Sequence, residues 1–176
     1  MTWFMILLYP LNATPPQPHT FVENRGLEPS MRLATYMKAN ISQSVRDVIV
    51  IWNRSYSDPN QQIAELLTLF RHLADATELP KQLLLNKNFE IYRVLHTQKI
   101  LKAVERLDRD IKKAYKALFS YSSVVIGTID GSMQSRYKKM LSTMQSMVNS
   151  YNNLAKVTNK EYKQNYLPYY RLNTKR

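Results

Sequence analysis

Residues 91–125 read IYRVLHTQKILKAVERLDRDIKKAYKALFSYSSVV, and this stretch decides the fold. Apolar or small side chains recur along it every three or four positions, which is the period of one face of an α-helix. The repeating positions are Ile91, Val94, Thr97, Leu101, Val104, Leu107, Ile111, Ala114, Leu118, Tyr121 and Val125. Two pairs of opposite charge spaced four residues apart also favour a helix. These pairs are Glu105 with Arg109 and Asp108 with Lys112.

The chain that follows predicts a second long helix. The glycine-bearing turn from Gly127 to Gly131 separates the two, and Ser132 is a candidate N-cap. The apolar stripe of this helix is Met133, Tyr137, Met140, Met144, Met147, Tyr151, Leu154 and Thr158. The pattern persists toward Tyr162, and Pro168 closes it. The second half of the chain is therefore predicted to be a helical hairpin.

The first half begins with another amphipathic helix. Ser30 is the candidate N-cap of a stripe that again uses spacings of three and four. Its members are Met31, Ala34, Met37, Ile41, Val45, Val48 and Trp52. The β-branched run Val48 to Ile51 leaves a local strand open as an alternative. We favour a helix because the stripe passes through this run unbroken.

The next helix has the clearest start. Asp58 can cap it, Pro59 suits the first helical position, and Gln61 stands where a capping box places Glu or Gln. Its face is Ile63, Leu66, Leu67, Phe70, Leu73, Ala74 and Thr77. Pro80 is expected to end the pattern, so residues 79–88 become a connection whose leucines, Leu83 to Leu85, pack against the bundle.

Two helical hairpins predict an all-α fold, a four-helix up-down-up-down bundle. We place the bundle at residues 29–166, after a signal-like or extended N-terminal arm at 1–28 and before a basic aromatic tail at 167–176. The length of 176 residues suits one domain, and only 3 glycines argue against a many-stranded β protein.

The N-terminal arm has two interpretations. Trp3 to Tyr9 is a short apolar run that resembles the end of a signal peptide, but no basic residue precedes it. The alternative is an ordered arm that covers one end of the bundle. Acceptor sequons for N-glycosylation stand at Asn12, Asn40 and Asn53, which suits a secretory route.

Residues for catalysis or cofactor binding are scarce. The chain has no cysteine, and its 3 histidines, His19, His72 and His96, share no spacing that would place two of them on one metal ion. His72 with Asp75 is the one acid and base pair on a helical face, and a solvated pair is the more common arrangement. Three scattered glycines do not form a phosphate-binding loop. We predict no enzyme activity, no metal and no cofactor.

Positive charge is concentrated in the second half. The net charge is +12, and residues 89–176 hold 17 of the 25 Lys and Arg. One basic stripe runs along the helix quoted first: Lys99, Lys102, Arg106, Arg109, Lys113 and Lys116. Because Glu105, Asp108 and Asp110 interrupt the stripe, we interpret it as a solvated face with salt bridges, and a contact surface is the alternative.

The C-terminal segment is the predicted binding site for a polyanion or a partner, because it mixes cations with tyrosines and has almost no acid. Its residues are Lys156, Lys160, Tyr162, Lys163, Tyr166, Tyr169, Tyr170, Arg171, Lys175 and Arg176. The alternative is a frayed terminus whose tyrosines pack back on the bundle.

These features lead to three functional hypotheses. The first is a noncatalytic, secreted helical bundle that binds another macromolecule, such as a receptor, a host factor or a heparin-like glycan, as a helical cytokine or another extracellular interaction protein does. The second is an intracellular basic subunit that binds RNA or DNA in a ribonucleoprotein. The third is a lipid carrier or membrane-surface protein, which the methionines of the last helix weakly favour.

Overall fold

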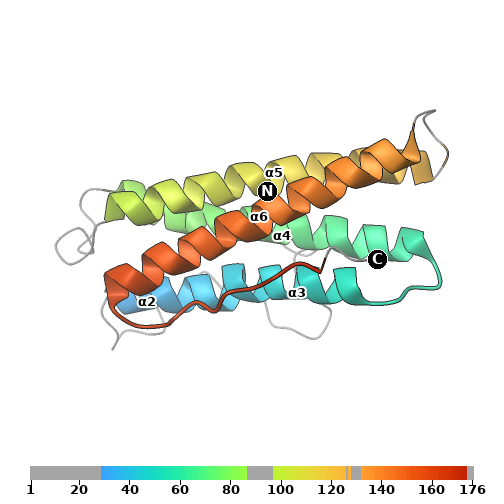
Figure 1. Cartoon of the computed structure of the whole chain (residues 1–176). Helices are drawn as coiled ribbons and strands as arrows, with labels where there is room; N and C mark the ends of the chain where they lie inside the picture. Colours follow the sequence, from blue (N-terminus) through green and yellow to red (C-terminus); the bar gives the residue numbers. More distant parts are fainter. Residues whose placement is uncertain (1–28, 87–96, 126, 128–131, 174–176) are drawn as a thin grey trace, which may run out of the picture.

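The computed structural model describes residues 29–86, 97–125, 127 and 132–173. Within these residues the chain is an all-α four-helix bundle, as predicted. The first rod consists of α2 (Pro29–Tyr36), η2 (Met37–Ser42) and α3 (Gln43–Asn53), and three long helices follow: α4 (Pro59–Leu85), α5 (Thr97–Val125) and α6 (Met133–Tyr162). Successive rods run in opposite directions, which gives the up-down-up-down order (Figure 1).

One hydrophobic core lies along the axis of the bundle. The stripes predicted for the four helices supply most of it, and the largest fully buried side chains include Tyr151, Phe70, Met37 and Leu107. Met133 is an exception, because its side chain is half exposed and its place in the predicted stripe was wrong. Burial of this continuous apolar surface is the main contribution to folding.

The first rod is helical throughout, so Val48 to Ile51 form helix and the alternative of a local strand is wrong. Ser30 lies inside the helix, which already includes Pro29, and it is not the N-cap. The middle of the rod, η2, is a π-helix, in which each N–H bonds to the carbonyl five residues back. The wider turn directs Met37, Ile41 and the polar Ser42 into the interior together.

Helix α4 begins as predicted. The Asp58 carboxylate accepts the N–H of Asn60 at 2.9 Å, and Pro59 occupies the first turn. The Gln61 amide donates to Glu65 along the helix, so the predicted capping box with Asp58 does not form. At the same end of the hairpin the Gln62 amide donates to the carbonyl oxygens of Ile51 and Trp52, which satisfies the last turn of α3.

The predicted end of α4 was wrong, because the helix continues through Pro80 to Leu85. A proline inside a helix removes one backbone hydrogen bond, yet tertiary packing can outweigh that loss. Here Pro80 and Leu84 are both buried, and Lys81 pairs with Asp108 on α5. Of the three leucines expected to pack, Leu84 is buried, Leu83 is partly buried and Leu85 is exposed.

The ends of α5 and α6 carry the predicted signals where the structure describes them. Ser132 accepts the N–H of Ser135 and caps α6, and Lys163 ends that helix in the left-handed region with φ of 54°. Gly127 also has a positive φ, 74°, which favours glycine. Ile91 and Val94 of the predicted stripe, and the arm at 1–28, lie outside the described residues.

Candidate polyanion-binding surface

Residues 163–173, which we call the strap, lie extended along the bundle and are not frayed (Figure 1). Two α6 asparagines each hold one backbone unit of the strap by a pair of hydrogen bonds. The Asn159 amide donates to the Leu167 carbonyl at 2.8 Å and accepts the Leu167 N–H at 2.9 Å. Asn152 does the same for Tyr170, at 2.8 and 2.9 Å.

The spacing of these pairs explains why the strap is extended. Asn152 and Asn159 are two helical turns apart, which is about 10.5 Å along the axis of α6. Leu167 and Tyr170 are three residues apart, and three residues of extended chain span about 10 Å. The strap runs antiparallel to α6, and these two distances are nearly equal. Asn159 can therefore bond to Leu167 while Asn152 bonds to Tyr170.

The tyrosines of the strap mostly face the bundle. The Tyr170 ring stacks on Tyr151 at 5.3 Å between centroids, and its hydroxyl bonds to Ser42. The Tyr151 hydroxyl, in turn, donates to the Pro168 carbonyl. The Tyr166 hydroxyl donates to the Met31 sulfur.

Burial therefore decides which aromatic rings of this segment are available. Burial raises the pKa of the Tyr162 hydroxyl well above its usual range. Only Tyr169, whose side chain is 58% exposed, presents a large free ring among the described tyrosines of the strap. The described tyrosines of the strap therefore offer one exposed ring for stacking, and the predicted binding site at these residues stays a prediction.

The cations of the predicted site take separate places. Lys156 and Lys160 are exposed on α6, whereas Lys163 and Arg171 are exposed at the start and near the end of the strap. Lys175 and Arg176 lie outside the described residues. The strap itself is thus tied to the bundle by apolar and backbone contacts, and its charges are few.

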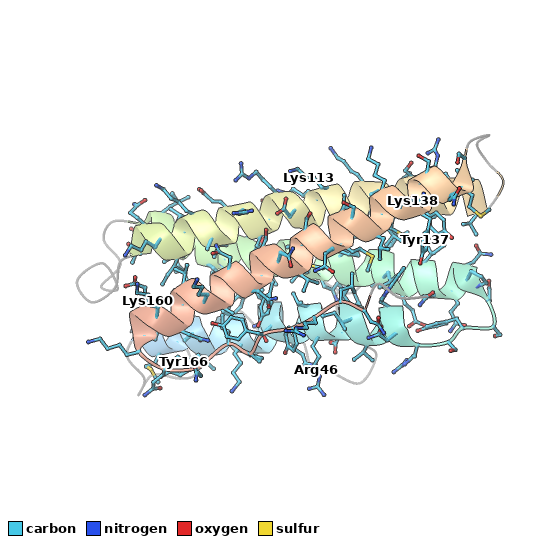
Figure 2. All side chains as sticks on the ribbon, viewed as in Figure 1. Arg46, Lys113, Tyr137, Lys138, Lys160 and Tyr166 are labelled. Carbon is cyan, nitrogen blue, oxygen red and sulfur yellow. The ribbon has the colours of Figure 1, made fainter. Side chains whose placement is uncertain are left out.

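The positive charge of the bundle is concentrated on α5 and α6. These two helices hold twelve basic residues (Lys and Arg) and four acidic residues (Asp and Glu), whereas α4 holds two basic and three acidic residues. We call their exposed cations the basic surface, apart from Lys112, which pairs with Asp108 toward α4, and Lys113, Lys138 and Lys160 mark the length of this surface in Figure 2. Its members are Lys99, Lys102, Arg106, Arg109, Lys113, Lys116, Lys138, Lys139, Lys156 and Lys160.

Two of the acids expected to interrupt the basic stripe are instead buried, so that part of the interpretation as a solvated face was wrong. Asp108 and Asp110 are only 7% and 9% exposed. The helical period of α5 places them toward the neighbouring helices, where Asp108 meets α4 and Asp110 meets Ser150 of α6 at 2.5 Å. Each of the two pairs with one exposed lysine, Lys112 or Lys113, and Glu105 is the one exposed acid among the described residues of α5.

Asp108 forms a polar connection between α4 and α5. Lys112 donates to it at 2.8 Å, as predicted, and Lys81 and Thr77 donate at 3.3 Å. Burial alone would raise the pKa of Asp108, but hydrogen bonds and charges from Lys112 and Lys81 outweigh burial and hold the pKa below its usual value. Asp108 is therefore ionised and structural. The other predicted pair is absent, because Arg109 has no ion pair within the part of the chain that the structure describes.

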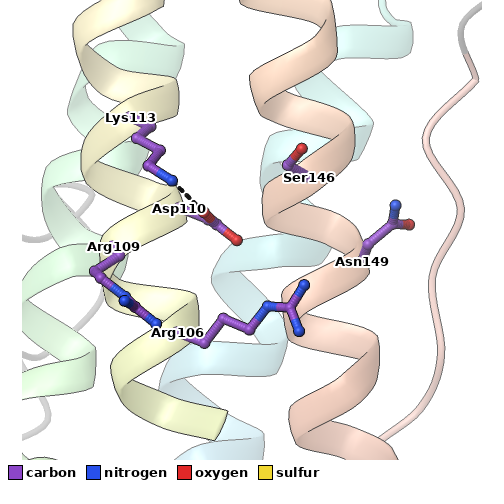
Figure 3. Close-up of a pocket in the computed structure, with 6 residues that line it drawn as sticks. All are labelled: Arg106, Arg109, Asp110, Lys113, Ser146 and Asn149. Carbon is purple, nitrogen blue, oxygen red and sulfur yellow. Dashed lines mark hydrogen bonds and ion pairs between the residues drawn. The ribbon is translucent and has the colours of Figure 1, made fainter. Parts of the chain in front are cut away.

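A cleft of about 320 Å³ opens in the middle of the basic surface, between α5 and α6 (Figure 3). Its α5 wall carries three cations and one acid, and its α6 wall carries a hydroxyl and an amide. The lining residues are Arg106, Arg109, Asp110, Lys113, Ser146 and Asn149. Arg106 reaches across from α5 toward Asn149, as Figure 3 shows. Lys113 turns instead to Asp110, at 3.4 Å.

The histidine and acid pair lies elsewhere. His72 and Asp75 are on α4, and burial raises the pKa of Asp75 although the charge of His72 opposes that shift. Across residues 29–86, 97–125, 127 and 132–173 no three His, Asp or Glu side chains are grouped in a way that would hold a metal ion. His19 and His96 are outside these ranges. Within the same ranges, no helix combines the length and the apolarity needed to cross a membrane.

Comparison of the chain with known protein families, with curated proteins and with solved structures finds no match. The functional argument therefore rests on the charge, shape and hydrogen bonding of the bundle itself.

Proposed function

We propose that this chain is a noncatalytic binding protein that holds a sulfated polysaccharide on the basic surface of α5 and α6. The observation that carries the proposal is the separation of charge: the exposed side chains of these helices are mostly cationic, while Asp108 and Asp110 are buried and bonded. A surface of this kind attracts anionic polymers through many weak contacts. Attachment through a helical pair suits a linear partner, because α5 and α6 together present a long row of cations.

A sulfated polysaccharide fits better than single-stranded nucleic acid. Sequence-independent binding of single strands relies on exposed aromatic rings that stack on bases. On this chain the rings of Tyr166 and Tyr170 are engaged with the bundle, and Phe119 and Tyr169 are the two exposed aromatic rings among the described residues. Recognition through sulfate groups needs cations and hydrogen-bond donors only.

Charge reversal on two faces tests the proposal. We expect Lys102→Glu with Lys138→Glu to lower the salt concentration needed for elution from immobilised heparin, and to lower affinity at least tenfold near physiological salt. The matched control is Lys38→Glu with Arg46→Glu on the first rod, which changes the net charge equally on another face (Figure 2 labels Arg46). The logarithm of affinity should fall linearly with the logarithm of salt concentration, as counterion release requires.

Three results would contradict the proposal. The proposal fails if immobilised heparin does not retain the wild-type chain at low salt. Equal losses in the two variants would mean that net charge, and not the basic surface, governs binding. Tighter binding to duplex DNA or RNA than to heparin of the same charge, measured by fluorescence anisotropy, would replace the polysaccharide with nucleic acid.

The extracellular setting that a sulfated polysaccharide implies has its own test. Asn53 is exposed as the last residue of α3, whereas Asn40 is partly buried in η2 and its amide donates to the Tyr36 carbonyl at 3.0 Å. A glycan on Asn40 would break that bond. We expect a chain passed through a secretory pathway, with Asn12→Gln to remove the first sequon, to carry a glycan at Asn53 alone. A glycosidase-sensitive gel shift should vanish in Asn53→Gln and remain in Asn40→Gln, and the reverse pattern would contradict the expectation.

A further inference from the structure

The cleft between α5 and α6 has an unbalanced set of charges. Asp110 is its one acid, and both carboxylate oxygens are engaged: Ser150 bonds to one at 2.5 Å and Lys113 bonds to the other at 3.4 Å. Arg106 and Arg109 line the same cleft without an ion pair in the part of the chain that the structure describes. Two guanidinium groups therefore share a recess whose only carboxylate is already bonded.

The remaining groups of the cleft are suited to an oxyanion. Guanidinium groups offer several N–H donors in a planar fork, which matches two oxygens of a sulfate or phosphate. Ser146 and Asn149 line the cleft from α6 with a hydroxyl and an amide, so hydrogen-bonding groups come from both helices. A planar carboxylate has two oxygens, and one guanidinium group binds both of them. A tetrahedral sulfate or phosphate has further oxygens, which can accept hydrogen bonds from donors on the opposite wall of the cleft.

The size of the cleft agrees with such a ligand. Its 320 Å³ is roughly ten times the volume of about 30 Å³ that one water occupies in the liquid. That space admits a sulfate or phosphate group together with part of the residue to which it is esterified. Because Asp110 lies on the α5 wall, an anion gains most by sitting near Arg106 and Asn149, away from the carboxylate (Figure 3).

We infer that this cleft is a specific subsite for one tetrahedral oxyanion, a sulfate or phosphate ester, with Arg106 as its principal cation and Arg109, Ser146 and Asn149 as supporting groups. The inference rests on the proposed function and sharpens it. A polymer bound along the basic surface is held diffusely by most of the cations, and one of its anionic groups is held in a fixed position between the two helices.

Titration of the ¹⁵N-labelled full chain with sodium sulfate, and separately with sodium phosphate, tests the subsite. The amide signals around Ser146 and Asn149 should shift and saturate at millimolar anion. Sodium chloride at equal ionic strength should leave them unchanged. Arg106→Gln should abolish the saturable shift, and Lys102→Gln, which removes the same charge from the same helix outside the cleft, should preserve it. Both positions are exposed, and thermal unfolding of each variant confirms that the bundle is intact.

A polymer titration separates the subsite from the diffuse surface. With a heparin oligosaccharide, Arg106→Gln and the charge-neutral change Asn149→Ala should lower affinity about tenfold and threefold, and Lys102→Gln should lower it less than threefold. Equal losses for Arg106→Gln and Lys102→Gln would overturn the subsite and leave the proposed function standing. Absence of wild-type binding would overturn the proposed function itself. Another outcome is a DNA duplex that binds more tightly than heparin and shows the same dependence on Arg106. That result would support the oxyanion subsite, with a phosphate polymer as its ligand in place of a sulfated one.

Discussion

Replacing Asn159 with alanine is expected to lower the free energy of unfolding by about 3 kcal/mol, because it leaves a buried N–H and a buried C=O of Leu167 without partners. Each buried backbone group that loses its hydrogen bond costs about 1–3 kcal/mol. We expect a loss toward the lower end of the combined cost of the two groups. The reason is that the strap can detach from α6, and water can then hydrate the N–H and C=O of Leu167. Urea unfolding followed by circular dichroism measures the change.

The matched control is Asn153→Ala, an exposed asparagine on the same helix. Alanine has a higher helix propensity than asparagine, so this variant should equal or slightly exceed the wild type in stability. A second readout locates the effect. Trypsin should cleave after Arg171 faster in Asn159→Ala than in the control, because a detached strap exposes that bond. Equal stabilities and equal cleavage rates in the two variants would show that the amide pair does not hold the strap.

Replacing Asp108 with asparagine is expected to lower the free energy of unfolding by about 2–3 kcal/mol at neutral pH. Removal of one partner of a buried ion pair costs about 3–5 kcal/mol. We expect a smaller loss here because Lys81 keeps its ion pair with Glu78, at 2.7 Å, and because the Lys112 side chain is largely exposed to water. The control is Glu105→Gln, since Glu105 is an exposed acid on the same helix. That variant should differ from the wild type by less than about 0.5 kcal/mol.

The effect of Asp108 should depend on pH with a fixed sign. Its pKa is lower in the folded chain than in the unfolded chain, where it is about 3.9. Its stabilisation is therefore complete above the unfolded pKa and is lost as the pH falls through the folded pKa. The difference in stability between wild type and Asp108→Asn should be constant from pH 7 to about pH 5 and shrink below pH 4. A difference that grows toward acid pH would contradict this assignment.

Helical periodicity predicted the fold because it reports which face of each helix is apolar, and one-sided faces in four consecutive helices have few ways to pack. It did not predict the length of α4. Pro80 breaks helices when only local hydrogen bonding is considered, but Leu84 packs in the core and Lys81 pairs across to α5, so tertiary contacts extend the helix. The π-helix η2 leaves the spacing of the apolar residues in the first rod almost unchanged. For that reason the apolar pattern of the sequence did not reveal it.

The candidate site was only partly predictable for a related reason. The basic stripe was recognised, but a single helix does not show what covers it. Asp110 counts as a surface charge until α6 places Ser150 against it. The two α6 asparagines that hold the strap, Asn152 and Asn159, were missed although they are seven residues apart, because their partners are backbone groups, which no side-chain pattern identifies.

The pairing of α6 with the strap also limits how this chain can vary. Substitutions at Pro168 and Tyr169 leave the backbone step between Leu167 and Tyr170 intact, since both side chains point to solvent. Inserting or deleting one residue there moves Tyr170 by about 3.3 Å along α6, whereas the next side chains on that face of the helix stand three or four residues, about 4.5–6 Å, from Asn152. Homologous chains that keep this strap should therefore vary in composition at these two positions and remain constant in length.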